Sequence, residues 1–404
     1  MLFVGLVRLL EGPARGDSLE SSFSIWALAH GDVSCAYPPG DTSGFPFIAP
    51  LYPLISGGVD SLVRIGHQIP FPSQAALGSN CSQAIAEMTK WSIRSGATAS
   101  TVHLGYLGWL VLMGGLIALL RAAGRGRCGW EPIALIFVAC VPPVFMCVQS
   151  EFHPQDLMAV GLALGGVACL ERRNWVLAGI LLGAAITSQQ FALLIFAPLV
   201  VIVPRRHRIK FVGSATGIAV AICLPLIALS AGRAIYPIVL GSGNGSQNGG
   251  TVLSALHVHG PLLIAASRVL PVVLSMLLAK WAIRKLGLRL FDPVPLISLL
   301  ATSLSLRLVF EQNLYGYYFM AVAVLLVLID VVRGHVSGYV VGWLGLVWLV
   351  FDPLPWRDYS LSQFNPIWIW HVILIPPTVA LAIRPLLGYV RDRVEPARVR
   401  PVED

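Results

Sequence analysis

The sequence predicts an all-α, polytopic membrane protein, and three observations support this class. Of 404 residues, 56% are hydrophobic and only 12% are charged, whereas charged residues make up about 25% of a typical soluble domain. The mean hydropathy is +0.75. Apolar stretches of helix length recur from residue 103 to residue 386, with short polar connections between them. We therefore expect one integral membrane domain.

Eleven apolar segments are the candidate transmembrane helices. In chain order they cover residues 103–120, 133–149, 157–170, 175–187, 191–203, 211–230, 261–283, 293–310, 315–332, 336–351 and 366–386. Several hold only 13 or 14 residues, fewer than the roughly 20 that cross about 30 Å of hydrocarbon. The region 175–203 is therefore expected to form two short helices or one interrupted hairpin. In the third segment, the spacing of Gly161 and Gly165 predicts close helix packing.

Basic residues occupy every second connection between these segments. They are Arg121, Arg125, Arg127, Arg172, Arg173, Arg205, Arg206, Arg208, Lys210, Lys280, Arg284, Lys285, Arg289, Arg333, Arg391, Arg393, Arg398 and Arg400. The intervening connections hold only Arg233 and Arg357. Because positive charge is retained on the cytoplasmic side, this alternation predicts a multi-pass protein of the cell (plasma) membrane with a cytoplasmic C-terminus. The net charge of +8 is thus explained by membrane topology, and we expect no nucleic-acid partner.

The sequence before the first segment divides into two parts. Residues 11–100 are predicted to form an extracytoplasmic first loop with interfacial helices, which requires a further span before them if the N-terminus is cytoplasmic. Only residues 1–10, "MLFVGLVRLL", are available, and they are too short to cross a bilayer. We interpret them as a partial first transmembrane helix truncated by a misassigned start; the alternative is an extracytoplasmic N-terminus. Residues 101–388 then form the multi-helix transmembrane domain, and residues 389–404 a cytoplasmic tail.

Polar and ionisable side chains gather at the predicted outer ends of the helices. They come from four segments: Asp17 and Glu20 in the first loop; Glu151, His153 and Asp156 in "EFHPQDLMAVGLAL"; Gln189 and Gln190 in the break at 188–190; and Arg307 and Glu311 near "LVFEQNLYGYYF". Ionisable groups near hydrocarbon are costly, so such groups suggest a functional site. Their shared side of the membrane predicts an outward-facing site.

Each of these groups also has a purely structural interpretation. Pro154 suits the first turn of a helix, and Asp156 there complements the positive end of the helix dipole. Arg307 and Glu311 are four residues apart and can form an intramembrane ion pair. The acids of the first loop can be solvated charges on an amphipathic helix. The inference of a site therefore depends on all four segments together.

Several of these stretches resemble the GT-C superfamily of integral-membrane glycosyltransferases, particularly actinobacterial members that use polyprenyl-phosphate sugars. The resemblance covers about residues 15–335 and lies in "GDSLESS", "HGDVSCAYPP", "IAPLYPLISGG", "HPQDLMAVGLALGGVACLERRNWVLAGILLGAAITSQQFALLIFAPLVV" and "RLVFEQNLYGYYF". It implies a GT-C-like helical bundle with about eleven transmembrane helices plus the partial first helix. It also implies transfer of a sugar, mannose or similar (hexosyl or pentosyl), from a polyprenyl-phosphate donor to a lipid or glycan acceptor of the cell envelope.

The resemblance further implies roles for individual residues. Asp17 and Glu20 match the catalytic acids of the first loop. The donor phosphate is assigned to Arg307, His153, Gln189 and Gln190, with Glu151, Asp156 and Glu311 in support. A divalent cation, Mg²⁺ or Mn²⁺, is the cofactor to consider. The acids depart from the adjacent acidic pair of some members, which leaves metal dependence and activity open.

Two other classes remain as alternatives. A membrane transporter or lipid flippase also has many spans and short interrupted helices, although its two halves often repeat and no internal repeat is evident here. A non-catalytic truncated paralogue would explain the incomplete first helix. Loss of sugar transfer on changing the first-loop acids would distinguish an enzyme from a transporter. For the truncated paralogue, the test is an in-frame apolar segment of about 20 residues encoded upstream of Met1.

Overall fold

The computed structural model describes most of the chain after residue 101 and one helix before it. The described residues are 49–63, 102–124, 130–139, 141–150, 152–232, 234–235, 252–256, 260–290, 292–311, 314–351 and 367–394, together with Ile25, Ala27, Leu28 and Ala36. Every regular element in these ranges is helical, and no strand occurs in them. The predicted all-α class is confirmed to this extent.

The helices follow the predicted apolar segments closely. They are α4 (Leu51–Val63), α7 (Val102–Ala122), α8 (Trp130–Ala139), α9 (Pro142–Phe145), η3 (Met146–Ser150), α10 (Pro154–Glu171), α11 (Trp175–Ser188), η4 (Gln190–Ala192), α12 (Leu193–Ile202), α13 (Arg205–Leu229), α15 (Val252–Ala255), α16 (Gly260–Leu286), α17 (Pro293–Phe310), η5 (Gly316–Phe319), α18 (Met320–Arg333), α19 (Gly338–Phe351) and α21 (Ile367–Val394). Helix forms in all eleven segments because each is predominantly apolar and has polar residues near its ends.

One segment is divided where a single helix was expected. The segment 133–149 contains α8, then Val141, then α9, and then η3, which is a π-helix. Pro142 and Pro143 cause the interruption, since proline has no N–H to donate and disfavours helical geometry in the residue before it. The region 175–203 forms two short helices, α11 and α12, joined by extended Gln189 and the 3₁₀ turn η4.

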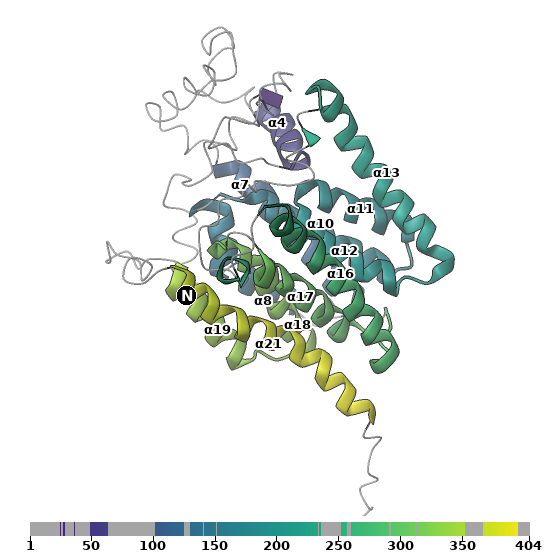
Figure 1. Cartoon of the computed structure of the whole chain (residues 1–404), viewed down its shortest axis with the longest axis vertical. Coiled ribbons are helices and arrows are strands. Elements are labelled where there is room, and N and C mark those ends of the chain that lie inside the picture. Colours follow the sequence, from purple (N-terminus) through teal and green to yellow (C-terminus); the bar gives the residue numbers. More distant parts are fainter. Residues whose placement is uncertain are drawn as a thin grey trace, which may run out of the picture.

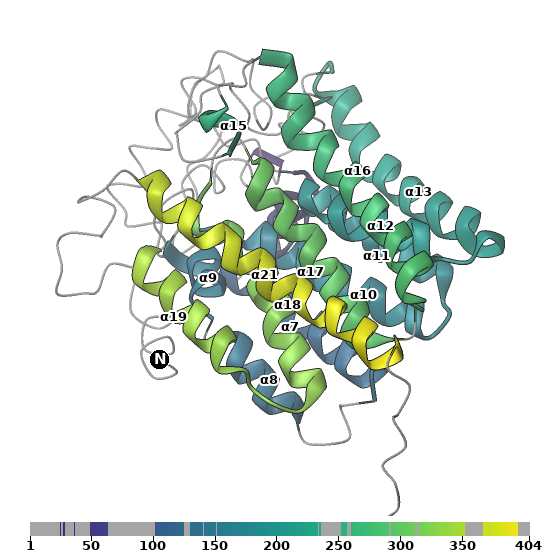
Figure 2. The ribbon, with the colours of Figure 1, turned by 60° about the horizontal axis from the view of Figure 1, so that its bottom comes forward.

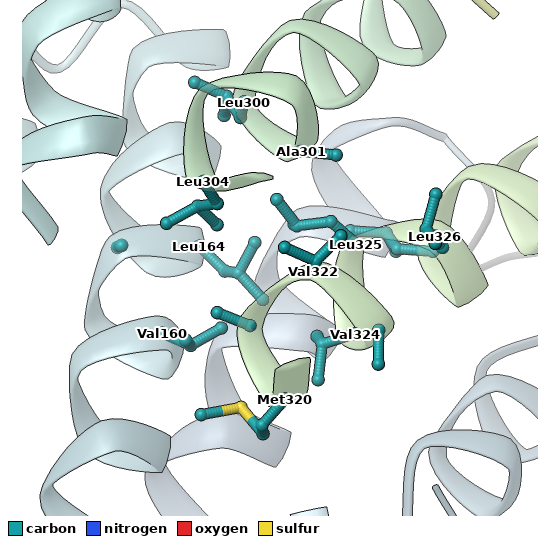
Figure 3. Close-up of a cluster of buried hydrophobic side chains, with 14 of the residues drawn as sticks. Val160, Leu164, Leu300, Ala301, Leu304, Met320, Val322, Val324, Leu325 and Leu326 are labelled. Carbon is teal, nitrogen blue, oxygen red and sulfur yellow. The ribbon is translucent and has the colours of Figure 1, made fainter. Parts of the chain in front are cut away.

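The helix α18 lies at the centre of the bundle, whereas α13 lies at its edge (Figures 1 and 2). Every residue of α18 from Met320 to Val332 is buried, while α13 buries only Phe211, Ala215 and Leu226. Figure 3 shows the packing around α18, where side chains of α10 and α17 meet those of α18. A helix that is apolar on all sides is expected in such a central position.

Small residues allow two of the helix pairs to approach closely. A Cβ added to Gly161 of α10 would lie 2.3 Å from the Val111 oxygen of α7, and one added to Gly115 would lie 2.0 Å from the Gly161 oxygen. On α11, Gly179 and Gly183 face α13 in the same way. The predicted close packing is thus found at Gly161. At Gly165, an added Cβ would meet only a side chain at ordinary contact distance, so the second glycine of that pair is not required for packing.

A buried hydroxyl connects α17 to α21. Ser298 donates a hydrogen bond to the Ala382 carbonyl (2.5 Å) and accepts one from the Leu386 N–H (3.1 Å). In a regular α-helix these two backbone groups would bond to each other. The Ser298 hydroxyl lies between them next to Pro385, which shows how a neighbouring helix compensates for a proline inside α21.

Five helical stretches are long and apolar enough to cross a membrane. They are Gly105–Ala122, Arg205–Leu229, Ala266–Leu286, Pro293–Phe310 and Gly316–Arg333. The outer helices α13 and α16 also expose large apolar side chains, among them Leu224, Leu262 and Leu277. A soluble protein rarely exposes so much contiguous apolar surface, so the fold is compatible with a multi-pass membrane protein. The prediction of about eleven transmembrane helices stays a prediction.

The first loop contributes a helix that packs on the bundle. Within "IAPLYPLISGG", residues from Leu51 onward form α4, and Tyr52 packs in a buried cluster with Ile25, Phe152 and Met158. Part of the first loop thus lies against the beginning of α10. The partial helix at residues 1–10 falls outside the described residues. At the other terminus, α21 continues to Val394, beyond the predicted start of the tail at residue 389.

Candidate functional site

The polar residues predicted at the outer helix ends come together where α10, α11, α16 and α17 meet the 3₁₀ turns η4 and η5. The α10 helix begins here at Pro154, α11 ends at Ser188, and α17 ends at Phe310. We refer to the side chains of His153, Asp156, Gln189, Arg268, Arg307 and Glu311 as the polar cluster.

His153 is held between an aromatic ring and an amide. Its ring stacks on Tyr317 of η5, with centroids 3.7 Å apart and an interplanar angle of 14°. The Gln155 amide lies 3.1 Å from His153 Nδ1. The two side chains are therefore joined by a hydrogen bond whose donor and acceptor depend on the tautomer of His153. The side chain does not cap α10.

The backbone immediately before His153 is strained. Phe152 is fully buried and has a φ of 57°, in the left-handed region that non-glycine residues seldom adopt. It follows the π-helix η3, and the His153 N–H bonds back to the Cys147 oxygen at 2.8 Å. Both π-helical turns and left-handed non-glycine residues occur preferentially near functional sites. His153 therefore follows directly after a strained residue, at the start of α10.

Asp156 is almost completely buried, at 1% exposure, in the first turn of α10. Its Oδ1 accepts a 2.7 Å hydrogen bond from Gln189 Nε2, and its Oδ2 has no hydrogen-bond partner in the described part of the chain. The neighbouring Ser188 hydroxyl donates to the Gln155 carbonyl at 3.0 Å. The turn between α11 and α12 is therefore fastened to the start of α10 by two hydrogen bonds. Helix-dipole capping accounts for the position of Asp156 but not for its contact with Gln189.

Arg307 and Glu311 form the ion pair that their spacing predicts, with Arg307 Nε 3.0 Å from Glu311 Oε2. A second cation also reaches Glu311, since Arg268 Nη1 of α16 lies 3.3 Å from Oε1. The Arg307 guanidinium lies over the Tyr318 ring at 3.9 Å and near the Phe191 ring at 4.8 Å. Two cations therefore share one buried carboxylate, and aromatic rings cover one of the cations.

The remaining predicted residues are placed less fully. Gln190 begins η4, and its backbone N–H donates to Gln189 Oε1 at 3.2 Å. Asp17, Glu20 and Glu151 lie outside the described residues. The structure thus brings together His153, Asp156, Gln189, Arg307 and Glu311. Their roles in binding or catalysis stay predictions.

Sequence reasoning missed Arg268 and the aromatic residues around the cluster. Arg268 is a single charge within the apolar segment 261–283, and that isolation was the available signal. The tyrosines of "YGYYF" carry no comparable signal, because aromatic residues are common near membrane interfaces. Only the fold places Tyr317 on His153 and Tyr318 under Arg307.

The described residues do not themselves form a metal site. No group of three or more His, Cys, Asp or Glu side chains that could hold a metal ion occurs among them. Asp156 and Glu311 are also engaged by an amide and by two arginines.

The arrangement is suited to binding an anion. Arg307 has five N–H donors, and only the one on Nε donates to Glu311. The four N–H groups on the Nη atoms of Arg307 have no acceptor within the described ranges.

Comparisons with models of protein families, with curated proteins and with solved structures find no match for this chain.

Proposed function

We propose that the protein is an integral-membrane glycosyltransferase that moves a sugar from a polyprenyl-phosphate donor to an acceptor hydroxyl on the extracytoplasmic face. The observation that carries the proposal is the Arg307 guanidinium, held by Glu311 and covered by Tyr318, with four N–H donors left for an anion. A phosphate group takes up such paired donors well. Because the site lies at helix ends beside apolar helices, a phosphate on a lipid chain can reach it from the bilayer.

In the reaction, the acceptor oxygen bonds to the anomeric carbon while the bond from that carbon to the phosphate oxygen breaks. A carboxylate takes the acceptor proton as the new bond forms, and Asp17 or Glu20 is proposed for this role. The leaving polyprenyl phosphate gains negative charge. Arg307 and Arg268 stabilise that charge because they are already positioned before the reaction begins.

The other members of the polar cluster position these groups. Glu311 holds both arginines and keeps their guanidiniums close together despite their like charge. Asp156 interacts electrostatically with Arg307 and His153. His153, stacked on Tyr317, lies at the beginning of α10 and is proposed to contact the donor.

The experiment is sugar transfer by the purified protein in vesicles, with a polyprenyl-phosphate-linked mannose as donor. Arg307→Gln should lower the transfer rate by about 100-fold, the usual effect of removing a group that stabilises developing charge. Asp17→Ala or Glu20→Ala should also abolish transfer. Arg289→Gln, an exposed change after α16, is the matched control and should leave the rate unaltered. A transfer rate that Arg307→Gln leaves unchanged would overturn the assignment of the phosphate site.

A transporter or lipid flippase is the second candidate. It is favoured by the interrupted helix between Trp130 and Ser150, because discontinuous helices are typical of transporters. In the same vesicles, movement of the intact lipid-linked donor across the bilayer without transfer of its sugar would support this candidate and contradict the first.

A further inference from the structure

A second polar site lies at the opposite end of α18 from the polar cluster. The two ends are separated by the 14 residues of α18, or about 21 Å of helix. Here the turn after α18, the beginning of α19 and part of α21 line an open cavity of about 370 Å³. That volume is at the lower end of the roughly 300–1,000 Å³ typical of small-ligand sites.

The cavity has an excess of positive charge. Arg333, His335 and Arg384 line it, and Asp330 is its one acidic residue. Neither arginine forms a salt bridge with a carboxylate in the described part of the chain, and the Arg384 guanidinium lies 5.1 Å from the Tyr339 ring centroid. The two guanidiniums and the one carboxylate give the cavity a net positive charge, without any contribution from His335.

Asp330 serves to hold the turn. It is buried, its Oδ2 accepts a 2.7 Å hydrogen bond from the Ser337 N–H, and its backbone oxygen accepts one from the His335 N–H at 3.1 Å. The left-handed Gly334 ends α18 just before. These bonds fix the turn with Arg333 and His335 on the cavity wall. The carboxylate is thus used within the protein, while the guanidiniums are exposed.

The beginning of α19 adds to the positive potential. This 14-residue helix starts at Gly338, on the cavity wall. The first N–H groups of a helix have no acceptor within the helix, and its N-terminal end carries partial positive charge. Together with two arginines in a cavity, this provides both donors and charge for an anion.

We propose that this cavity binds the phosphate of an anionic phospholipid headgroup. The cavity belongs to the end of the bundle where the basic connections gather, including Arg333 and, after α16, Arg284 and Arg289. Basic pockets between helices at this face take up anionic headgroups. The apolar residues Leu326, Ile329 and Leu381 also line the cavity and provide a surface for the adjoining lipid chain. The site is independent of the proposed glycosyltransferase activity.

The test is a titration of the purified full chain in neutral detergent, with thermal unfolding as the readout. The probes are a short-chain phosphatidylglycerol, the matching phosphatidylcholine and inorganic phosphate. Phosphatidylglycerol should raise the unfolding temperature in a saturable manner, and phosphatidylcholine should not. The double variant Arg333→Gln/Arg384→Gln should weaken phosphatidylglycerol binding at least about tenfold, since charge-assisted hydrogen bonds are lost.

The matched control removes two exposed arginines at the same end but outside the cavity, Arg284→Gln/Arg289→Gln. It should change the affinity by less than about twofold, because neither residue lines the cavity and charges at a distance from the bound headgroup are screened by salt. If the cavity variant does not fold, each single change should still weaken binding. Equal binding of inorganic phosphate would overturn the lipid as the source of the anion. The site itself would be overturned if the two double variants lost phosphatidylglycerol affinity equally, or if the wild type showed no saturable binding of phosphatidylglycerol.

Discussion

Asp156 and Gln189 show how a single contact can organise the polar cluster. The residues are 33 positions apart, and their 2.7 Å hydrogen bond joins the start of α10 to the end of α11. Asp156 lies at 1% exposure, so water cannot replace the amide if it is removed. A buried acceptor that loses its donor keeps its full desolvation cost.

A double-mutant cycle with Asp156→Ala, Gln189→Leu and the double change should therefore give a coupling energy of about 1–3 kcal/mol. The measurement is the free energy of unfolding in detergent for the wild type and all three variants. Gln189→Leu alone should be destabilising. Additive effects of the two single changes would show that the contact contributes nothing to stability.

At the scale of elements, glycines determine which helices pack closely. The α7 helix carries Gly114 and Gly115 side by side, yet only Gly115 faces α10. A Cβ at Gly115 would lie 2.0 Å from the Gly161 oxygen, whereas one at Gly114 would have nothing within 4 Å. The obstacle at Gly115 is backbone, which cannot rotate away as a side chain can.

Gly115→Ala should thus force α7 and α10 apart and destabilise the protein by about 1–3 kcal/mol, the usual cost of overpacking. Gly114→Ala is the matched control, with the same chemical change one residue away, and should cost about 0.5 kcal/mol or less. Thermal unfolding of both variants in detergent measures the difference. Equal unfolding temperatures would contradict the close contact of α7 with α10.

At the scale of the whole molecule, burial separates helices of similar composition. In their most apolar windows, 89% of Gly316–Arg333 is buried in the protein, against 11% of Arg205–Leu229. The apolar surface that α13 and α16 expose is where lipid contact is expected. The basic connections predict which end of this bundle faces the cytoplasm.

Reporter fusions test that orientation. A green fluorescent protein joined after Asp404 should fluoresce, because the C-terminus is predicted to be cytoplasmic. Alkaline phosphatase joined after Gly232, in the connection that follows α13, should be active because its disulfides form only outside the cytoplasm. Exchanging the two reporters is the control and should silence both. The opposite pattern would invert the predicted topology and place the polar cluster at the cytoplasmic face.

The sequence by itself determined the helical class and the approximate limits of the helices. Apolar composition and polar interruptions are local properties, so residues 293–310 were predicted as a helix with the same bounds that α17 has. Spacing along one helix is also local, and it predicted the pair of Arg307 with Glu311. The interruption of 133–149 by Pro142 and Pro143 was readable from the sequence but was not predicted.

Only the tertiary structure decided which side chains from different helices meet. Arg268 reaches Glu311 across 43 positions, Tyr317 covers His153, and Gln189 finds Asp156. These contacts depend on how closely the helices approach and on how each helix is rotated about its axis. Glycines such as Gly115 and Gly161 allow the close approach, but the periodicity of the sequence does not specify which helices make it. The same holds for burial, because apolar side chains facing lipid and those facing protein look alike in the sequence.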